Sequence, residues 1–215
     1  MFYQSIRIQI AIITKLINNT KFKIDKGDHL LDTHTHILWN IDDGSKNQCM
    51  SLQMLEIAAR SGTKAIFATP HVIERANKPS WEEIKEKTQQ LRQLCAEAQI
   101  DIMLYPGAEV QMNWELLPEL GATGAYCLNG GRYLLIELPA AEIPAYADEF
   151  WYELELKGIT PILAHPERYQ QLRENPDLLL LWRRRGMLMQ CNSGSFTGMF
   201  GSSVCENAKV LLANG

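Results

Sequence analysis

From residue 30 onward, short apolar runs that end in polar or charged residues alternate with longer stretches of helical periodicity. This alternation is typical of βα units arranged around a parallel sheet or barrel. It predicts strands over residues 30–37, 64–69, 101–105, 133–138, 161–164 and 187–192. It predicts helices over residues 46–60, 81–98, 143–156, 176–185 and 203–213. The chain is therefore expected to adopt an α/β fold.

Residues at the ends of these segments support the boundaries. Ser80 precedes a first turn that contains Glu82, which suits an N-cap and the positive end of the helix dipole. Gly62, Gly158 and Gly186 each follow a predicted helix, where a left-handed C-cap favours glycine.

The composition is that of an ordinary globular protein and indicates one main domain. Of the 215 residues, 46% are hydrophobic and 21% are charged, which is enough to bury a substantial core. The net charge of −4 argues against nucleic acid as a partner, because proteins that bind the phosphate backbone usually carry a basic face. The five cysteines form no CxxC pair, and a reducing cytoplasm fits them best.

Residues 1–28 differ from the rest and are expected to form an N-terminal extension, with the main domain over residues 29–215. Residues 6–17 are largely apolar but include Arg7 and Lys15, and basic residues follow. No run reaches the roughly 20 apolar residues of a membrane span. The sequence leaves three interpretations open: a disordered extension of no special role, an amphipathic helix on the domain, or peripheral contact with an anionic membrane.

The first predicted strand ends in DTHTH, which contains Asp32, His34 and His36. The strand period of two places these three side chains on one face, so the two histidines can hold the same metal ion. Asp32 lies one step deeper and is expected to orient a ligand histidine rather than to bind metal. HxH alone is a weak signal, and similar residues at other strand ends strengthen it.

Three of those residues are His71, Glu109 and Glu137. His71 follows the apolar run that ends at Pro70, where a histidine alone would more often be a hydrogen-bonded loop residue. Glu137 follows the run YLLI, and a carboxylate at the end of a buried strand is costly unless a cation compensates it. An ion pair with Arg132 is the alternative for Glu137. Glu109 stands in the turn PGAE and completes the set.

His165 closes the apolar run PILA, and Arg168 follows it within one turn. The planar fork of arginine suits phosphate or carboxylate oxygens. Clustered metals beside an arginine suit a phosphoester, whose oxygens carry charge through the transition state. The alternative for Arg168 is a surface salt bridge with Glu167 or Glu174.

The loop after the first strand contains Asp42, Asp43 and Lys46. Either aspartate can serve as the N-cap of the first helix. The functional alternative is that Asp43 acts as an acid or base on the attacking water or the leaving group, with Lys46 in contact with phosphate. The residues alone do not decide between these alternatives.

Six segments of the chain resemble, in order and spacing, motifs of the bacterial polymerase-and-histidinol-phosphatase (PHP) family. They are DTHTHILWNIDDG, FATPH, GAEV, LLIELP, GITPILAHPERY and QCNSGSFTGMFG. Within that family they are most similar to the manganese-dependent protein tyrosine phosphatases of capsule and exopolysaccharide operons. The resemblance implies a distorted seven-stranded (β/α) PHP barrel. It also implies an enzyme that acts on the phosphotyrosine tail of a polysaccharide-export tyrosine kinase.

The resemblance further implies roles for individual residues. Arg168 grips the phosphate, and Asp43 assists catalysis. Two or three divalent ions are expected, typically manganese, although the ligand types suit iron and zinc as well. In such enzymes a metal-bound hydroxide attacks phosphorus directly, and no phosphocysteine forms. The implied metal ligands are His34, His36, His71, Glu109, Glu137 and His165.

One departure from the family pattern concerns the C-terminus. Family members continue into a further strand that ends in Asp-x-His and supplies two more ligands, and no such motif follows residue 187 here. The expectation is a truncated domain whose barrel lacks its last strand and leaves an edge on which copies can associate. Two other functions stay open: hydrolysis of a small phosphomonoester such as histidinol phosphate, and non-catalytic binding of metal or kinase.

Overall fold

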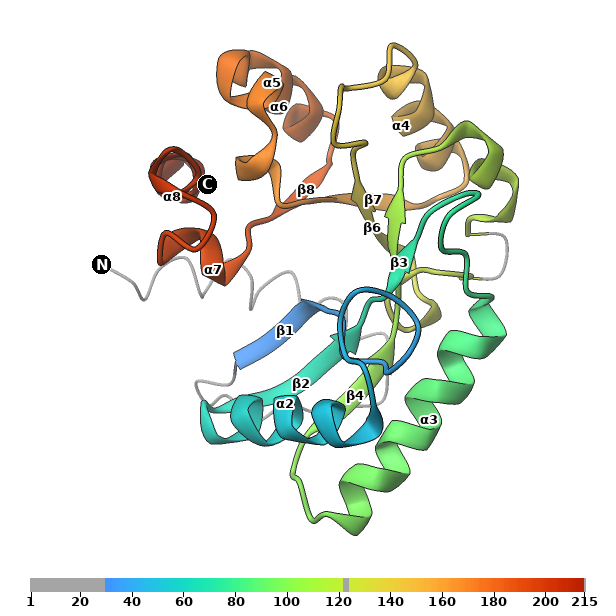
Figure 1. The fold of residues 1–215 in the computed structure, drawn as a ribbon. Helices are drawn as coiled ribbons and strands as arrows, with labels where there is room; N and C mark the ends of the chain where they lie inside the picture. The colour runs from blue at the N-terminus through green and yellow to red at the C-terminus, as the bar shows by residue number, and fades with distance from the viewer. Residues whose placement is uncertain (1–29, 122–123, 215) are drawn as a thin grey trace.

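The computed structural model describes residues 30–121 and 124–214 (Figure 1). The strands pair in parallel and form two sheets. The smaller sheet has the order β1 (Leu30–Thr35), β2 (Thr63–Ala68), β4 (Met103–Pro106). The larger has the order β3 (His71–Val72), β5 (Glu109–Gln111), β6 (Tyr133–Glu137), β7 (Thr160–Ala164), β8 (Leu188–Gln190). The α/β class is confirmed, and the predicted extension over residues 1–28 lies outside the described residues.

Two short strands that the sequence did not predict follow the second and third predicted strands. The second predicted strand corresponds to β2, which β3 follows, and the third corresponds to β4, which β5 follows. Pro70 separates β2 from β3 because it has no N–H for the ladder. Gly107 lies at the second break, where a Cβ would stand only 2.7 Å from Leu128 Cδ2. At both breaks the chain passes from the smaller sheet to the larger one, which pairs His71 with Glu109.

The main helices lie where the sequence predicts them. They are α2 (Gln48–Arg60), α3 (Trp81–Glu97), α4 (Ala147–Leu156), α6 (Pro176–Arg184) and α8 (Ser202–Asn214). Shorter elements are α5 (Gln170–Glu174), α7 (Ser193–Phe196) and the 3₁₀ turns η1 (Trp114–Glu119), η2 (Leu128–Gly130) and η3 (Pro166–Arg168). Within residues 30–121 and 124–214, no helix has the length and apolar character needed to cross a membrane.

Two helix starts test the predicted caps. Ser80 Oγ accepts a hydrogen bond from Glu83 N at 3.1 Å, so its predicted role is confirmed. Asn47 caps α2 instead of either loop aspartate, because its side chain accepts a hydrogen bond from Met50 N at 2.9 Å. The loop aspartates are thereby left for other contacts.

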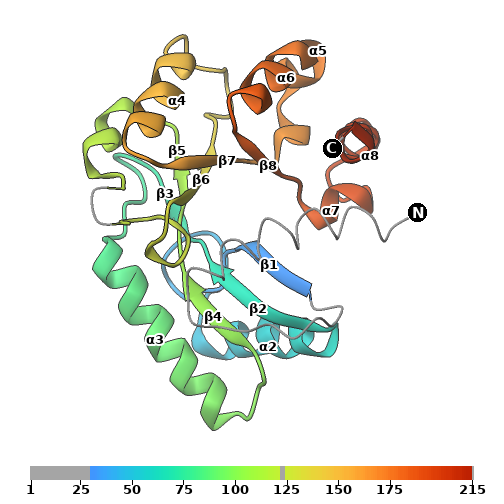
Figure 2. The same ribbon diagram turned by 180° about the vertical axis from the view of Figure 1, so that it is seen from behind.

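The two sheets share an interior. Helices α2 and α3 flank the smaller sheet, and α4, α5 and α6 flank the larger one (Figures 1 and 2). Along β2, Ile66 packs in the same core as Leu91 of α3, whereas Phe67 packs with Leu135 and Ile162 of the larger sheet. The strand period of two thus buries both faces of β2. The shared interior holds the strand ends of both sheets in a fixed relation.

Candidate metal centre

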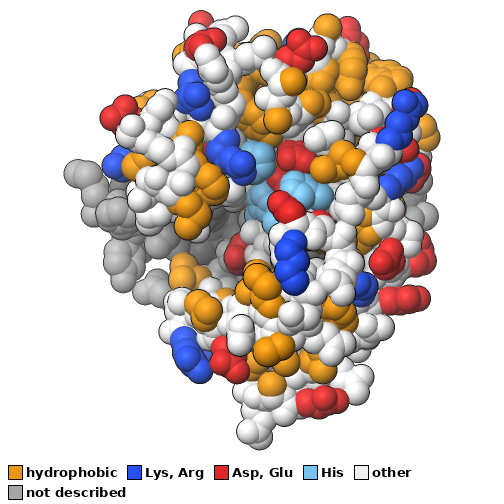
Figure 3. Space-filling view, in the orientation of Figure 1, with side chains coloured by type: hydrophobic (Ala, Val, Ile, Leu, Met, Phe, Trp, Pro, Cys, Tyr) orange, Lys and Arg blue, Asp and Glu red, His pale blue; other side chains and the backbone are white. Residues whose placement is uncertain are grey.

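The six predicted metal ligands converge at the ends of strands, where parallel sheets commonly build their active sites. Figure 3 shows histidine side chains together at a hollow in one face of the molecule, with carboxylates among them. The ligands come from the end of β1 (His34, His36), the first residues of β3 and β5 (His71, Glu109), the last residue of β6 (Glu137) and the residue after β7 (His165).

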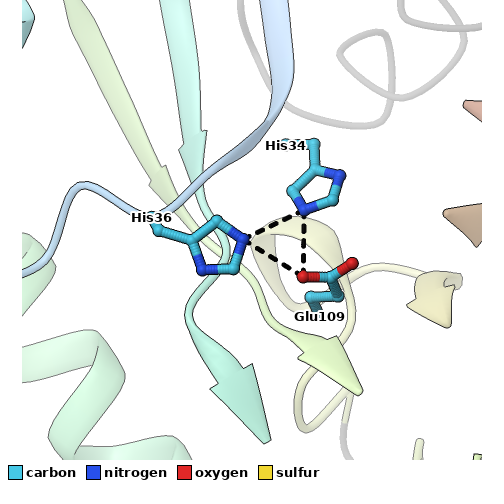
Figure 4. A group of neighbouring side chains, drawn as sticks. All are labelled: His34, His36 and Glu109. Carbon is cyan, nitrogen blue, oxygen red and sulfur yellow. Dashed lines mark hydrogen bonds and ion pairs between the residues drawn. The ribbon is translucent and has the colours of Figure 1, made fainter. Parts of the chain in front are cut away.

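Three ligand-type atoms form a tight triangle (Figure 4). His34 Nε2 lies 3.1 Å from His36 Nε2 and 3.0 Å from Glu109 Oε2, and His36 Nε2 lies 3.1 Å from the same oxygen. Ligand atoms that bind one divalent ion at about 2.1 Å and at right angles are about 3.0 Å apart. The triangle therefore has the spacing of three ligands that share an ion.

His71 and Glu137 extend the cluster. His71 Nδ1 lies 3.2 Å from both Glu109 Oε2 and Glu137 Oε1. This nitrogen and the Glu137 oxygen are both buried and lack a partner in good hydrogen-bond geometry. Arg132, the alternative partner of Glu137, lies instead over the ring of Tyr133 at 5.1 Å from its centroid. A cation between His71 and Glu137 would satisfy both atoms.

His165 reaches the cluster from the larger sheet. Its Nε2 lies 2.8 Å from Glu109 Oε1 and 4.0 Å from Glu137 Oε2. Its backbone has φ 35°, in the left-handed region that residues with a side chain rarely adopt. Strain of this kind is commonly kept at functional sites, and here it turns the chain from β7 into η3 while the ring stays on Glu109.

The charges of the cluster are coupled around Glu109, which is 1% exposed. Burial alone would raise the pKa of this carboxyl, but hydrogen bonds from the surrounding histidine rings hold the pKa well below its usual range. Burial opposes protonation of His36, yet Asp42 and Glu109 raise its pKa to about 10. The pKa of His71 is also raised, against burial, by Glu137 and Glu109. The buried carboxylates therefore demand positive charge, from protons or from metal.

Two residues to which the sequence motifs assigned no such role orient the histidine rings. Asp42 Oδ2 lies 2.7 Å from His36 Nδ1 and accepts a hydrogen bond from His71 N at 2.9 Å. Gln190 Oε1, on β8, lies 2.8 Å from His34 Nδ1. In both rings the contact engages the nitrogen opposite the Nε2 that faces the cluster. This is the usual arrangement around metal-binding histidines.

Asp32, which the sequence predicts to orient a ligand histidine, contacts the backbone of His34. Its exposed carboxylate accepts a hydrogen bond from His34 N at 3.0 Å and makes no hydrogen bond or ion pair with a ring of the described residues. The register of β1 against β2 shifts after Asp32, so the period of two does not hold there. Asp42 takes the role because the loop folds back onto His36. Gly44 permits that approach, since a Cβ at this position would collide with His36 O.

Asp43 and Lys46 lie on the same loop at the rim of the cluster. Asp43 Oδ1 is 3.7 Å from both His36 Nδ1 and His71 Nε2, and its side chain is 79% exposed. Lys46 Nζ donates a hydrogen bond to the backbone oxygen of Asp43 at 2.7 Å. The structure thus brings Asp43 to the predicted ligands, whereas Lys46 contacts the loop backbone.

Arg168 stands one turn after His165, whose backbone oxygen accepts a hydrogen bond from Arg168 N at 3.0 Å. The side chain is exposed, and its guanidinium carbon lies 4.7 Å from the ring centroid of Phe200. In the described part of the chain it forms no ion pair with Glu167 or Glu174, the partners of the alternative interpretation. The guanidinium therefore has donors to offer to an anion.

The segment HPERY also contains two tethers to which the sequence motifs assigned no role. Glu167 is fully buried, and its Oε1 accepts hydrogen bonds from Asn192 N at 2.9 Å and from Ser195 Oγ at 2.6 Å. The hydroxyl of Tyr169 accepts a hydrogen bond from Leu138 N at 2.8 Å. Glu167 lies three residues after the apolar strand β7, but its partners come from the end of β8 and from α7, which local sequence does not reveal.

The donor set fits divalent metal ions. Imidazole nitrogens and carboxylate oxygens are ligands that suit manganese, iron and zinc. The unsatisfied buried atoms of His71 and Glu137 also call for a cation. Among the described residues, three groups each have ligand atoms within 4.8 Å of one another. The first is His34, His36 and Glu109; the second is His36, Asp43 and His71; the third is His71, Glu109 and Glu137. The cluster can therefore hold more than one ion.

Comparisons with known proteins find relatives over most of the chain. Tyrosine-protein phosphatase YwqE of Bacillus subtilis is 36% identical over 175 residues, which are 81% of this chain and 69% of YwqE. The putative tyrosine-protein phosphatase CapC of Staphylococcus aureus is 33% identical over the same shares. Tyrosine-protein phosphatase CpsB of Streptococcus pneumoniae is 30% identical over 164 residues, 76% of this chain and 68% of CpsB.

A solved structure is similar along most of the chain. It comes from work on YwqE of Bacillus subtilis and CpsB of Streptococcus pneumoniae, described as metal-dependent tyrosine phosphatases. It matches with a TM-score of 0.81 and 35% identity, over 86% of this chain and 74% of that chain. A family model described as capsular polysaccharide synthesis, CpsB/CapC, matches residues 30–215. The chain therefore belongs to the CpsB/CapC family of capsular polysaccharide synthesis.

Proposed function

We propose that this chain is a metal-dependent tyrosine-protein phosphatase of capsular polysaccharide synthesis. The observation that carries the proposal is the set of four histidines around the buried Glu109, with Arg168 one turn from His165. Such a site suits a phosphomonoester, because cations beside the phosphoryl group stabilise the charge that develops on its oxygens. The similarity to YwqE and CpsB supports phosphotyrosine as the substrate.

The proposal assigns two or three manganese ions to the cluster. Bound divalent ions would polarise the phosphoryl group and activate the attacking water. Asp42 and Gln190 keep the imidazole rings in the orientation that presents Nε2 to the cluster. The ligands in this proposal are His34, His36, His71, Glu109, Glu137 and His165.

Residues at the rim act on the substrate. Arg168 binds two phosphate oxygens through its planar fork. Asp43, exposed and next to His36 and His71, supplies a proton to the leaving tyrosine oxygen. Lys46 contacts the phosphate by exchanging its hydrogen bond with the Asp43 backbone for one with the substrate.

We further propose how the whole domain is built and on what it acts. Residues 29–215 form a PHP-type metallophosphatase domain, in which the strands of both sheets belong to a distorted seven-stranded (β/α) barrel. The interior shared by the two sheets supports that architecture. The enzyme acts in the cytoplasm on the phosphotyrosine tail of a polysaccharide-export tyrosine kinase, in line with the capsule family to which the chain belongs.

The test is phosphate release from a phosphotyrosine peptide with Mn²⁺, with and without a chelator. We expect turnover to stop when the metal is chelated. Turnover that is insensitive to the chelator would reject the proposal. Arg168→Ala should lower kcat/KM, whereas the control Arg184→Ala, on the exposed face of α6, should not. A higher kcat/KM for histidinol phosphate than for the phosphopeptide would assign the site to small phosphomonoesters instead.

A further inference from the structure

The loop between α7 and α8 places an aromatic ring against the guanidinium of Arg168. The guanidinium carbon lies 4.7 Å from the centroid of Phe200, well within the range of a cation–π contact. The ring is 39% exposed, so it does not belong to the hydrophobic core. Arg168 forms no ion pair with another described residue, and its guanidinium lies against this ring.

The loop has the backbone features that seat the ring. A Cβ on Gly194 would lie 3.2 Å from Phe200 Cε2 and 3.1 Å from Met199 Sδ, closer than ordinary contacts. A glycine at this position therefore leaves the room in which the ring lies. Gly198 and Gly201 have φ of 82° and 96° and turn the chain on either side of the Met199–Phe200 pair.

The loop is also tied to the turn that carries Arg168. The buried carboxylate of Glu167 accepts hydrogen bonds from Asn192 N and Ser195 Oγ at the start of α7. Asn207 of α8 donates a hydrogen bond to the backbone oxygen of Glu167 at 3.4 Å. The segment that carries the ring and the turn that carries the arginine are thus joined by hydrogen bonds.

We propose that Phe200 is a positioning residue that holds Arg168 ready for the phosphate of phosphotyrosine, an inference that rests on the proposed function. Stacking uses the face of the guanidinium and leaves the N–H donors at its edge for phosphate oxygens. A long side chain that is already held loses less rotamer freedom when it binds. The effect of Phe200 is therefore on substrate binding, and not on the chemical step.

The kinetic test compares Phe200→Leu with Phe200→Trp. Leucine keeps an apolar side chain and loses the π face, so KM for a phosphotyrosine peptide should rise about two- to fivefold. Tryptophan should keep KM near the wild-type value, and kcat and metal content should be unchanged in both variants. In an Arg168→Ala background, Phe200→Leu should have no further effect on KM. An equal rise in KM in both backgrounds would overturn the proposal.

A spectroscopic test is independent of turnover. The ring current of Phe200 should displace the Nε–H resonance of Arg168, which is assigned by its loss in Arg168→Lys. Phe200→Leu should move that resonance, and the control Met199→Leu, at a 74% exposed neighbour, should not. An unmoved resonance in Phe200→Leu rejects the positioning role. A moved resonance in a chain that does not hydrolyse phosphotyrosine supports the stacking contact and rejects the proposed function.

Discussion

The metal centre has two unlike sides. On the side of β1, β3 and β5, the nitrogens of His34, His36 and His71 lie 3.0–3.2 Å from one buried oxygen of Glu109. On the side of β7, β8 and α7, Arg168 projects into solvent and rests on an exposed aromatic ring. The first side is a dense set of compensating charges, and the second is a single exposed cation against an aromatic ring.

This difference indicates a division of labour. Removing one member of a buried charged cluster leaves the others uncompensated, so the cost is large and falls on metal binding. An exposed cation is screened by water, so changes there should alter substrate binding by modest factors. Variants on the two sides should therefore differ in the size of their effect and in the constant that changes.

Glu109→Gln tests the buried side most severely. Glutamine keeps the shape of glutamate and removes the charge that compensates four histidines, so tightly bound metal should be lost. The rate should fall on the order of 1000-fold. Metal analysis after gel filtration and turnover of a phosphotyrosine peptide measure both effects. The control Glu115→Gln, which removes an exposed carboxylate, should behave like the wild type. Full metal content in Glu109→Gln would contradict the assignment of metal binding to the buried side.

Asp42→Asn and Asp32→Asn form a matched pair on the same side. Asp42 contacts the His36 ring, whereas Asp32 contacts only the backbone of His34. The first change should weaken metal binding by about 10- to 100-fold, as for other partners of metal-binding histidines. The second should leave it within about twofold of the wild-type value. Titration of the metal-free proteins with Mn²⁺ measures the difference. Equal effects of the two changes would restore the role that the sequence assigned to Asp32.

The contrast between these aspartates also shows what the sequence can predict. The strands and helices follow from local apolar periodicity, and the candidate ligands follow from residue types at strand ends. Asp32 contacts the His34 backbone and not its ring, at a point where a register shift in β1 breaks the period of two. Asp42 and Gln190 could not be assigned from spacing, because their contacts depend on how a loop folds back and on how the side chain of Gln190 reaches His34 from the other sheet.

The same limit applies to β3 and β5. Each has only two or three residues, too few for a periodic signal, and each begins after a break that changes sheets. His71 and Glu109 still stand out as candidate ligands, because a histidine or glutamate after an apolar strand is unusual in itself. Residue type therefore points to the cluster, and tertiary contacts show its other members.

The dependence of metal affinity on pH tests whether His36, on the buried side, is protonated before metal binds. In the metal-free protein the pKa of His36 is raised to about 10, so this imidazole is protonated at pH 7 and must lose its proton to bind metal. Affinity should therefore rise about tenfold per pH unit for each displaced proton, and the rise should stop once the pH exceeds that pKa. Competition with a chelator between pH 6 and pH 8 covers part of the rise. An affinity that is flat over this range would show that His36 is neutral before metal binds.

Ser195→Ala should have the smallest effect, because it loosens the second side without touching a ligand or Arg168. It removes one of the two hydrogen bonds to the buried Oε1 of Glu167, which should lower the free energy of unfolding by about 1–3 kcal/mol. Because Glu167 ties α7 to the turn of Arg168, KM for a phosphotyrosine peptide should rise a few-fold while metal affinity stays unchanged. Urea unfolding and steady-state kinetics measure these effects, with Ser193→Ala at an exposed position of α7 as the control. An equal loss of metal affinity and substrate affinity in Ser195→Ala would contradict the separation of the two sides. It would mean that the hydrogen bonds of Glu167 hold the buried candidate ligands as well as the turn of Arg168.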